Sequence, residues 1–90
     1  MKPFTVQPTP NPNSLKFTST GPPFIAQGLL ACSNPTEASE HPLSAELFGI
    51  EGIYSVLILP PFTTVTKRPE ADWNEILPRV EGILEAHLIP

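Results

Sequence analysis

The stretch GIYSVLILPPFTTVTK, Gly52–Lys67, decides the fold of this chain. Ile53–Leu59 is apolar apart from one tyrosine and one serine, and Phe62–Lys67 alternates between two sides. Two such runs around a Pro-Pro pair predict a β-hairpin, because proline cannot donate a hydrogen bond to the ladder and belongs in the turn. The first run is apolar on both sides, so we expect it at the centre of a sheet and the second run nearer an edge.

The first part of the chain predicts short strands separated by stiff connections. Phe4–Gln7 and Ser14–Thr18 alternate apolar and polar residues, so we pair them as antiparallel strands. Pro8–Asn13 joins them as a rigid loop, because its three prolines fix φ and its asparagines favour turns. Leu29–Cys32 is a further candidate strand at a sheet edge, and Asn34–Glu40 reads as a polar connection.

Two helices are predicted in the second half. Pro42–Phe48 begins with proline at its first position, with His41 as N-cap, and Gly49 is expected to close it in the left-handed conformation. Asp72 and Glu75 form a capping-box variant that opens the last helix. One wide apolar stripe runs along that helix: Trp73, Ile76, Leu77, Val80, Ile83, Leu84 and Leu88. Pro78 predicts a kink or a loose first turn there.

These elements predict a single α+β domain over residues 1–90. The order is strand, strand, an optional strand, helix, strand, strand, helix. We expect a two-layer sandwich with a mainly antiparallel sheet of four to five strands and two helices on one face.

Composition narrows the class of partner and the compartment. A net charge of −4 argues against nucleic acid or an anionic membrane as partner. The single cysteine excludes an internal disulfide and favours a reducing compartment. The first residues lack the apolar segment of a signal peptide, and no stretch is apolar enough to span a bilayer, so we expect a cytoplasmic protein.

The candidate partner-binding residues are Asn11, Asn13, Lys16 and Lys67. The two asparagines lie in the rigid loop, whose stiffness lowers the entropy lost on binding; the alternative is a stiff turn that only joins two strands. The two lysines, with Arg68, form a basic spot on the exposed sheet face if their strands are neighbours; the alternative is scattered solubilising charge. The acidic side of the last helix reads as a solvated surface.

The sequence contains few residues in patterns typical of a metal site or a catalytic site. Cys32 and His41 are weak metal candidates, with Glu37 or Glu40 as additional ligands. One thiolate and one imidazole are too few for a zinc site, so we read Cys32 as a small buried apolar residue and His41 as a surface residue at a helix start. No Gly-rich phosphate loop, nucleophile elbow or paired-histidine motif is present, so we do not expect an enzyme.

Three segments together resemble one family. They are Thr9–Phe17 (TPNPNSLKF), Pro42–Lys67 with its proline-started helix and terminal T-V-T-K, and Asp72-Trp73 with Leu77-Pro78. This pattern is similar to the N-terminal domain of the NifU-like (Nfu) iron–sulfur scaffold proteins. Leu59 and Pro61 depart from the family pattern at the hairpin tip, and residues 22–40 match poorly.

The resemblance implies an accessory domain of iron–sulfur cluster assembly. In full-length scaffolds a second domain holds the C-x-x-C pair that binds the cluster; we expect this chain to be a stand-alone domain without it. Expected partners are a C-x-x-C scaffold or a cysteine desulfurase, with no cofactor held by this chain alone and transient iron implied by the family. Two alternatives remain open: a small iron-binding or iron-delivering protein, and a structural homodimer formed by edge-to-edge strand pairing or by charge.

Overall fold

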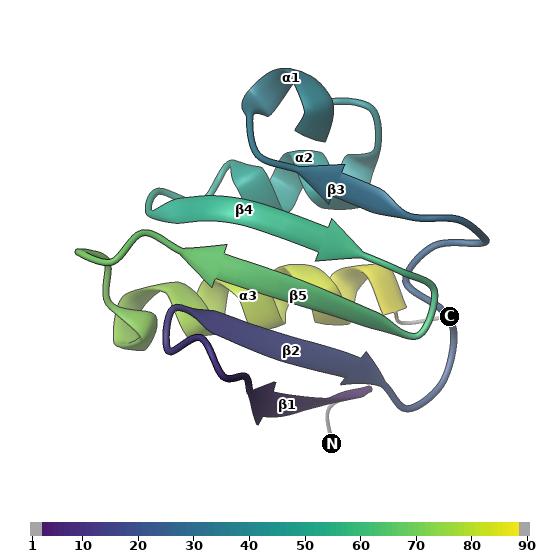
Figure 1. Cartoon of the computed structure of the whole chain (residues 1–90). Helices are drawn as coiled ribbons and strands as arrows, with labels where there is room; N and C mark the ends of the chain where they lie inside the picture. The colour runs from purple at the N-terminus through teal and green to yellow at the C-terminus, as the bar shows by residue number, and fades with distance from the viewer. Residues whose placement is uncertain (1–2, 89–90) are drawn as a thin grey trace.

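The computed structural model describes residues 3–88 and forms a five-stranded antiparallel sheet with three helices. In chain order the elements are β1 (Phe4–Pro8), β2 (Ser14–Ser19), β3 (Leu30–Cys32), α1 (Pro35–Ala38), α2 (Pro42–Phe48), β4 (Ile53–Ile58), β5 (Phe62–Lys67) and α3 (Trp73–Leu88). The strand order is β1-β2-β5-β4-β3, and each neighbouring pair is antiparallel (Figure 1).

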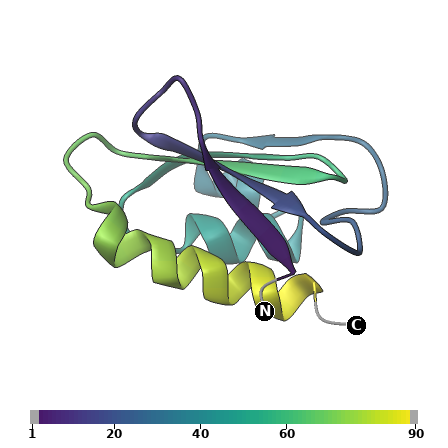
Figure 2. The same cartoon turned by 90° about the horizontal axis from the view of Figure 1, so that it is seen from below.

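The molecule has two layers. Helices α2 and α3 cover one face of the sheet and leave the other face open, while α1 lies beside β3 (Figure 2). Thr63 and Val65 of β5 face the helices and are fully buried, whereas Thr64 and Thr66 on the open face are half-buried. The helix layer is needed because only one face of the sheet is apolar. The predicted α+β sandwich is confirmed.

The central strand of the sheet is β5, so the expectation that the first hairpin strand is central was wrong. β5 pairs with β2 on one side and with β4 on the other, and β4 is followed outward by β3. The mostly apolar character of β4 reflects its place between β5 and a three-residue edge strand. A central strand in a two-layer fold needs only one face suited to burial, and β5 buries Thr63, Val65 and Lys67 on the helix side.

Two local predictions about turns need correction. The segment expected to be a polar connection contains α1, whose N-cap Asn34 accepts a hydrogen bond from the Glu37 amide at 2.9 Å, with Pro35 at the first position. Gly49 ends α2 with φ −72°, so it is not left-handed. The left-handed position is Gly52, at φ 101°. A Cβ there would lie 3.0 Å from the side chains of Ala71 and Ile76.

Helix α3 supplies the largest apolar surface under the sheet. Ile76, Val80, Leu84 and Leu88 are buried, which confirms the predicted stripe. Pro78 lies inside this helix on its exposed side. The helix is one continuous element from Trp73 to Leu88, so Pro78 does not mark a loose turn ahead of the regular helix, and the kink stays a prediction. Within residues 3–88 no helix has the length and apolar character needed to cross a membrane.

Candidate functional site

The loop between β1 and β2 is held in shape by its own side chains. The Thr9 hydroxyl donates to the Asn11 carbonyl at 2.9 Å, and the Asn13 amide donates to the Asn11 side-chain oxygen at 2.9 Å. A further bond runs from the Ser14 amide to the Asn11 carbonyl at 3.0 Å. The Asn11 amide donates to the Thr9 hydroxyl at 3.1 Å, which makes a Ser/Thr turn, and the bond from Asn13 to the Asn11 side chain makes an Asx turn. Together with the prolines, these turns fix the backbone of an exposed loop.

Lys67, the last residue of β5, ties this loop to the sheet. Its amide donates to the Asn13 carbonyl at 2.8 Å, and its Nζ donates to the Asn13 side-chain oxygen at 3.0 Å. Nζ also donates to the Arg68 carbonyl at 3.3 Å, and the residue is only 8% exposed. A buried ammonium needs such acceptors because desolvation is costly. Lys67 and Asn13 therefore act as one unit that positions the loop.

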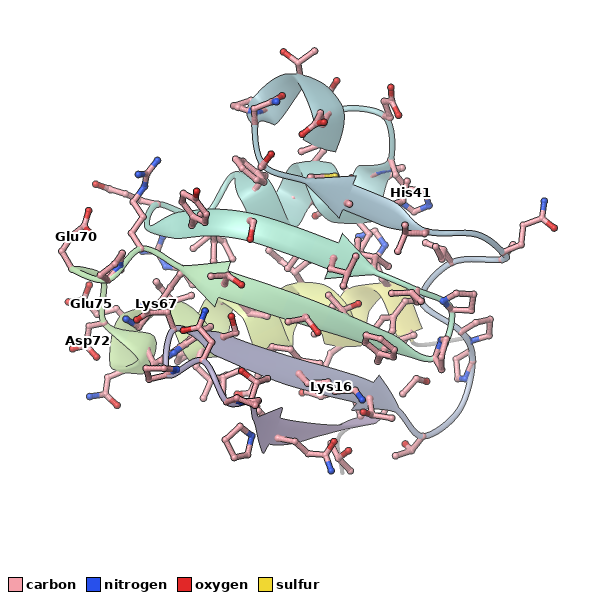
Figure 3. The ribbon with its side chains drawn as sticks, viewed as in Figure 1. Lys16, His41, Lys67, Glu70, Asp72 and Glu75 are labelled. Atoms are coloured by element: carbon pink, nitrogen blue, oxygen red, sulfur yellow. The ribbon has the colours of Figure 1, made fainter. Side chains whose placement is uncertain are left out.

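The start of α3 makes the third side of the site. The indole N–H of Trp73 donates to the Pro12 carbonyl at 3.4 Å, so the loop also contacts the helix. Asp72 caps the helix by accepting the Asn74 amide at 2.9 Å. The loop, the end of β5 and the start of α3 thus meet at one end of the sheet, and Figure 3 labels Lys67, Asp72 and Glu75 at that end.

A hollow of about 540 Å³ lies next to this junction. Its lining combines an apolar floor with four carboxylates and two guanidinium groups: Ile50, Glu51, Gly52, Arg68, Glu70, Ala71, Asp72, Glu75, Ile76 and Arg79. The sequence predicted no pocket, because the lining comes from the connection before β4, the connection after β5 and α3. It holds no Ser, Cys, His or Lys, and it offers carboxylate, guanidinium and apolar contacts.

Lys16 lies apart from Lys67. Lys16 points to the open face of the sheet, where its Nζ sits 4.4 Å from the centre of the Phe62 ring. Lys67 points to the helix side of the neighbouring strand. The two strands do pair, but the side chains leave opposite faces, so the predicted shared basic spot does not form. Lys16 remains a single cation on an otherwise Thr- and Ser-rich surface.

The candidate metal residues do not assemble into a ligand set. Burial raises the pKa of the Cys32 thiol above its usual value. A hydrogen bond with Ser44 lowers this pKa, and the nearby carboxylates of Glu37 and Glu40 raise it, so that the net shift is upward. His41 caps α2 by accepting the Leu43 amide on Nδ1 at 3.1 Å. Over residues 3–88 no group of three or more His, Cys, Asp or Glu side chains could hold a metal ion.

The segments that meet at the loop are those that carry the family pattern. The family model "Scaffold protein Nfu/NifU N terminal" matches residues 4–89. The chain belongs to this family. Each of the three characteristic segments contributes one residue to the junction: Asn13, Lys67 and Trp73. The sequence analysis placed Trp73 in the apolar stripe and in the family pattern, and nothing in the spacing indicated its bond to the loop.

Curated relatives include the human mitochondrial NFU1 iron–sulfur cluster scaffold homolog, 45% identical over 75 residues. That match covers 82% of this chain and 29% of the human protein. NifU-like protein 5, mitochondrial, of Arabidopsis thaliana is 35% identical over 78 residues, covering 87% of this chain and 28% of that protein. The chain therefore spans less than a third of these Nfu proteins.

Solved structures show the same fold. The solution structure of a NifU-like protein from Saccharomyces cerevisiae superposes with a TM-score of 0.79 at 27% identity, covering 92% of this chain and 75% of that one. The crystal structure of protein SAV1430 from Staphylococcus aureus gives a TM-score of 0.76 at 26% identity, covering 94% and 100%. This Nfu domain thus shares its sheet and helix layer with both proteins.

Proposed function

We propose that this Nfu N-terminal domain is a non-catalytic docking module that binds protein partners during iron–sulfur cluster assembly. The observation that carries the proposal is the junction of Asn13, Lys67 and Trp73, which draws together the three family segments around one exposed loop. A network that serves only the core would not need to hold a polar surface loop at three points. The adjacent hollow supplies further charged and apolar side chains for contact with a partner.

The docking surface is the loop Thr9–Asn13, with Asn11 as its exposed contact residue. The side-chain amide of Asn11 has donors free for a partner while its oxygen holds the turn. Asn13 and Lys67 position the loop, and their contribution to binding is therefore indirect. The rigid backbone reduces the entropy lost on association. Lys16, on the open sheet face, is proposed as a separate and weaker contact.

The partner class follows from the family. The relatives are named as iron–sulfur cluster scaffolds, and this chain matches only part of each. We infer that the domain docks to a C-x-x-C scaffold or to a cysteine desulfurase. Those relatives are named as mitochondrial, and the cytoplasmic location expected from the sequence stays a prediction.

Binding of purified proteins tests this function. The chain is immobilised and titrated separately with a purified C-x-x-C scaffold and with a purified cysteine desulfurase. Asn11→Ala should weaken binding roughly tenfold, which corresponds to about 1.4 kcal/mol. Gln27→Ala is the matched control, because it removes another exposed amide from a different connection.

The control should bind as tightly as the parent chain. If neither protein binds, the assignment of the partner class is wrong. If a protein binds and Asn11→Ala matches the parent, the loop is not the docking surface.

A further inference from the structure

Strand β1 leaves one edge of the sheet open. The opposite edge, β3, has three residues and lies beside α1, whereas β1 has five residues and, among residues 3–88, no strand or helix beyond it (Figure 1). Its register with β2 contains no bulge. The segment Pro3–Pro8 carries no charged residue. Edge strands are usually protected by charges, prolines, bulges or a covering segment. Within residues 3–88, this edge has prolines only at its two ends, Pro3 and Pro8, and Phe4–Gln7 between them has none of these protections.

The backbone bonds identify which groups of β1 already have partners. The Thr20 amide donates to the Pro3 carbonyl at 2.9 Å, so this pair lies at a hydrogen-bonded position of the β1–β2 ladder. Hydrogen-bonded pairs alternate along an antiparallel ladder. Thr5 and Gln7 are therefore the next residues whose amides and carbonyls point toward β2.

The remaining groups of β1 point away from the sheet. These are the N–H and C=O of Phe4 and of Val6, and the C=O of Pro8, which has no N–H. The Val6 side chain is 36% exposed on the helix side of this edge, next to Phe4, which is buried. The edge thus offers two donors and three acceptors beside one uncovered apolar side chain.

We propose that two copies of this chain pair through antiparallel β1 strands, with the two-fold axis at Thr5. In this register Phe4 lies opposite Val6 of the second copy, and Val6 lies opposite Phe4 of the second copy. Each such pair exchanges two hydrogen bonds, so four outward donors and four outward acceptors are satisfied. Val6 packs against Phe4 of the second copy, and two threonines stand opposite each other on the open face.

The neutral edge offers no charge with which to select an oppositely charged partner, and a second copy presents the same neutral edge. The chain carries a net charge of −4, so two copies repel each other across most of their surface. The neutral segment Pro3–Pro8 is where they can approach without apposing like charges. Its donors lie two residues apart, which is the spacing that a two-fold axis at Thr5 requires. The contact is short, so the dimer is weak and forms at high concentration. It does not depend on the docking role of the loop.

Sedimentation equilibrium with two lysine variants tests the pairing. Thr5→Lys places two ammonium groups directly opposite each other at the axis and should raise the dimer dissociation constant at least roughly tenfold. Gln7→Lys adds the same charge to the same strand and face. In this register residue 7 lies opposite Pro3 of the second copy, so the two new lysines do not face each other and the dimer dissociation constant should change by less than roughly twofold. An equimolar mixture of Thr5→Lys and Thr5→Glu should restore the dimer.

Val6→Pro supplies a second, independent test. Proline removes an N–H that points outward, so the β1–β2 ladder keeps its bonds while the dimer loses two of its four. An unchanged thermal midpoint together with loss of the dimer supports the pairing. A parent chain that stays monomeric at about 1 mM overturns it, and so does a dimer that survives both Thr5→Lys and Val6→Pro.

Discussion

Replacing Thr63 with valine should make the domain more stable. Thr63 is the second residue of the central strand β5, is fully buried, and its hydroxyl has no hydrogen-bond partner. Its cross-strand neighbours are Phe17 and Ile58. An unpaired buried hydroxyl costs about 1–3 kcal/mol, and valine has the same shape without it. We therefore expect a gain of about 1 kcal/mol or more, which raises the thermal midpoint by roughly 4–8 °C in a domain of this size.

Urea unfolding followed by far-UV circular dichroism measures this gain. The control is Thr64→Val, because Thr64 lies on the open face of the same strand and is half-buried. The control should change the free energy of unfolding by less than about 0.5 kcal/mol. A loss of stability in Thr63→Val would contradict the reasoning, since it would mean that the hydroxyl contributes a bond in the folded state.

Three further predictions concern the loop, the cysteine and the short helix. Asn13→Ala should lower the free energy of unfolding by about 1–3 kcal/mol, because it leaves the buried Lys67 ammonium short of an acceptor; Asn11→Ala should cost less in the same urea titration. The raised pKa of the Cys32 thiol favours the folded state below the pKa of the unfolded thiol, and this contribution is lost as the pH rises through the folded pKa. The parent should therefore lose stability relative to Cys32→Ala above about pH 8.5. Asn34→Ala should cost about 1 kcal/mol and speed amide exchange in α1.

Periodicity predicted the elements whose burial follows one simple rule. The stripe of α3 places apolar residues toward the sheet, and the alternation of β2 and β5 correctly predicts which residues share a face, with Phe17 and Val65 buried. The Asp72 cap was likewise predictable, because a local side-chain bond decides it. In each case the spacing of residue types along the chain is enough to predict the structural feature.

Strand order could not be predicted from the same patterns. β4 has the most continuous apolar run, yet the central place belongs to β5 because of long-range pairing with β2. Register and neighbours depend on which side chains fit together across the sheet, which is not a property of one segment. The misplacement of Lys67 on the open face has the same origin, since facing direction follows from the register.

Short-range signals were also overlooked or misread. Asn34 with Pro35 and Glu37 is a helix-start pattern that correctly predicts α1 once it is considered as a cap. Gly49 follows a helix, which favours the left-handed conformation, but the sharp turn falls at Gly52. There the close approach of Ile76 requires the absence of a side chain, and only the packed structure contains that contact.

Chemical-shift mapping tests the central claim most directly. The ¹⁵N-labelled domain is titrated with an unlabelled, purified C-x-x-C scaffold protein. The account predicts that the largest shifts fall on the loop residues Thr9, Asn11 and Asn13, on Lys67 and on the Trp73 indole N–H. Shifts confined to the open sheet face, or no shifts at saturating concentration, would contradict the claim that this junction is the docking surface.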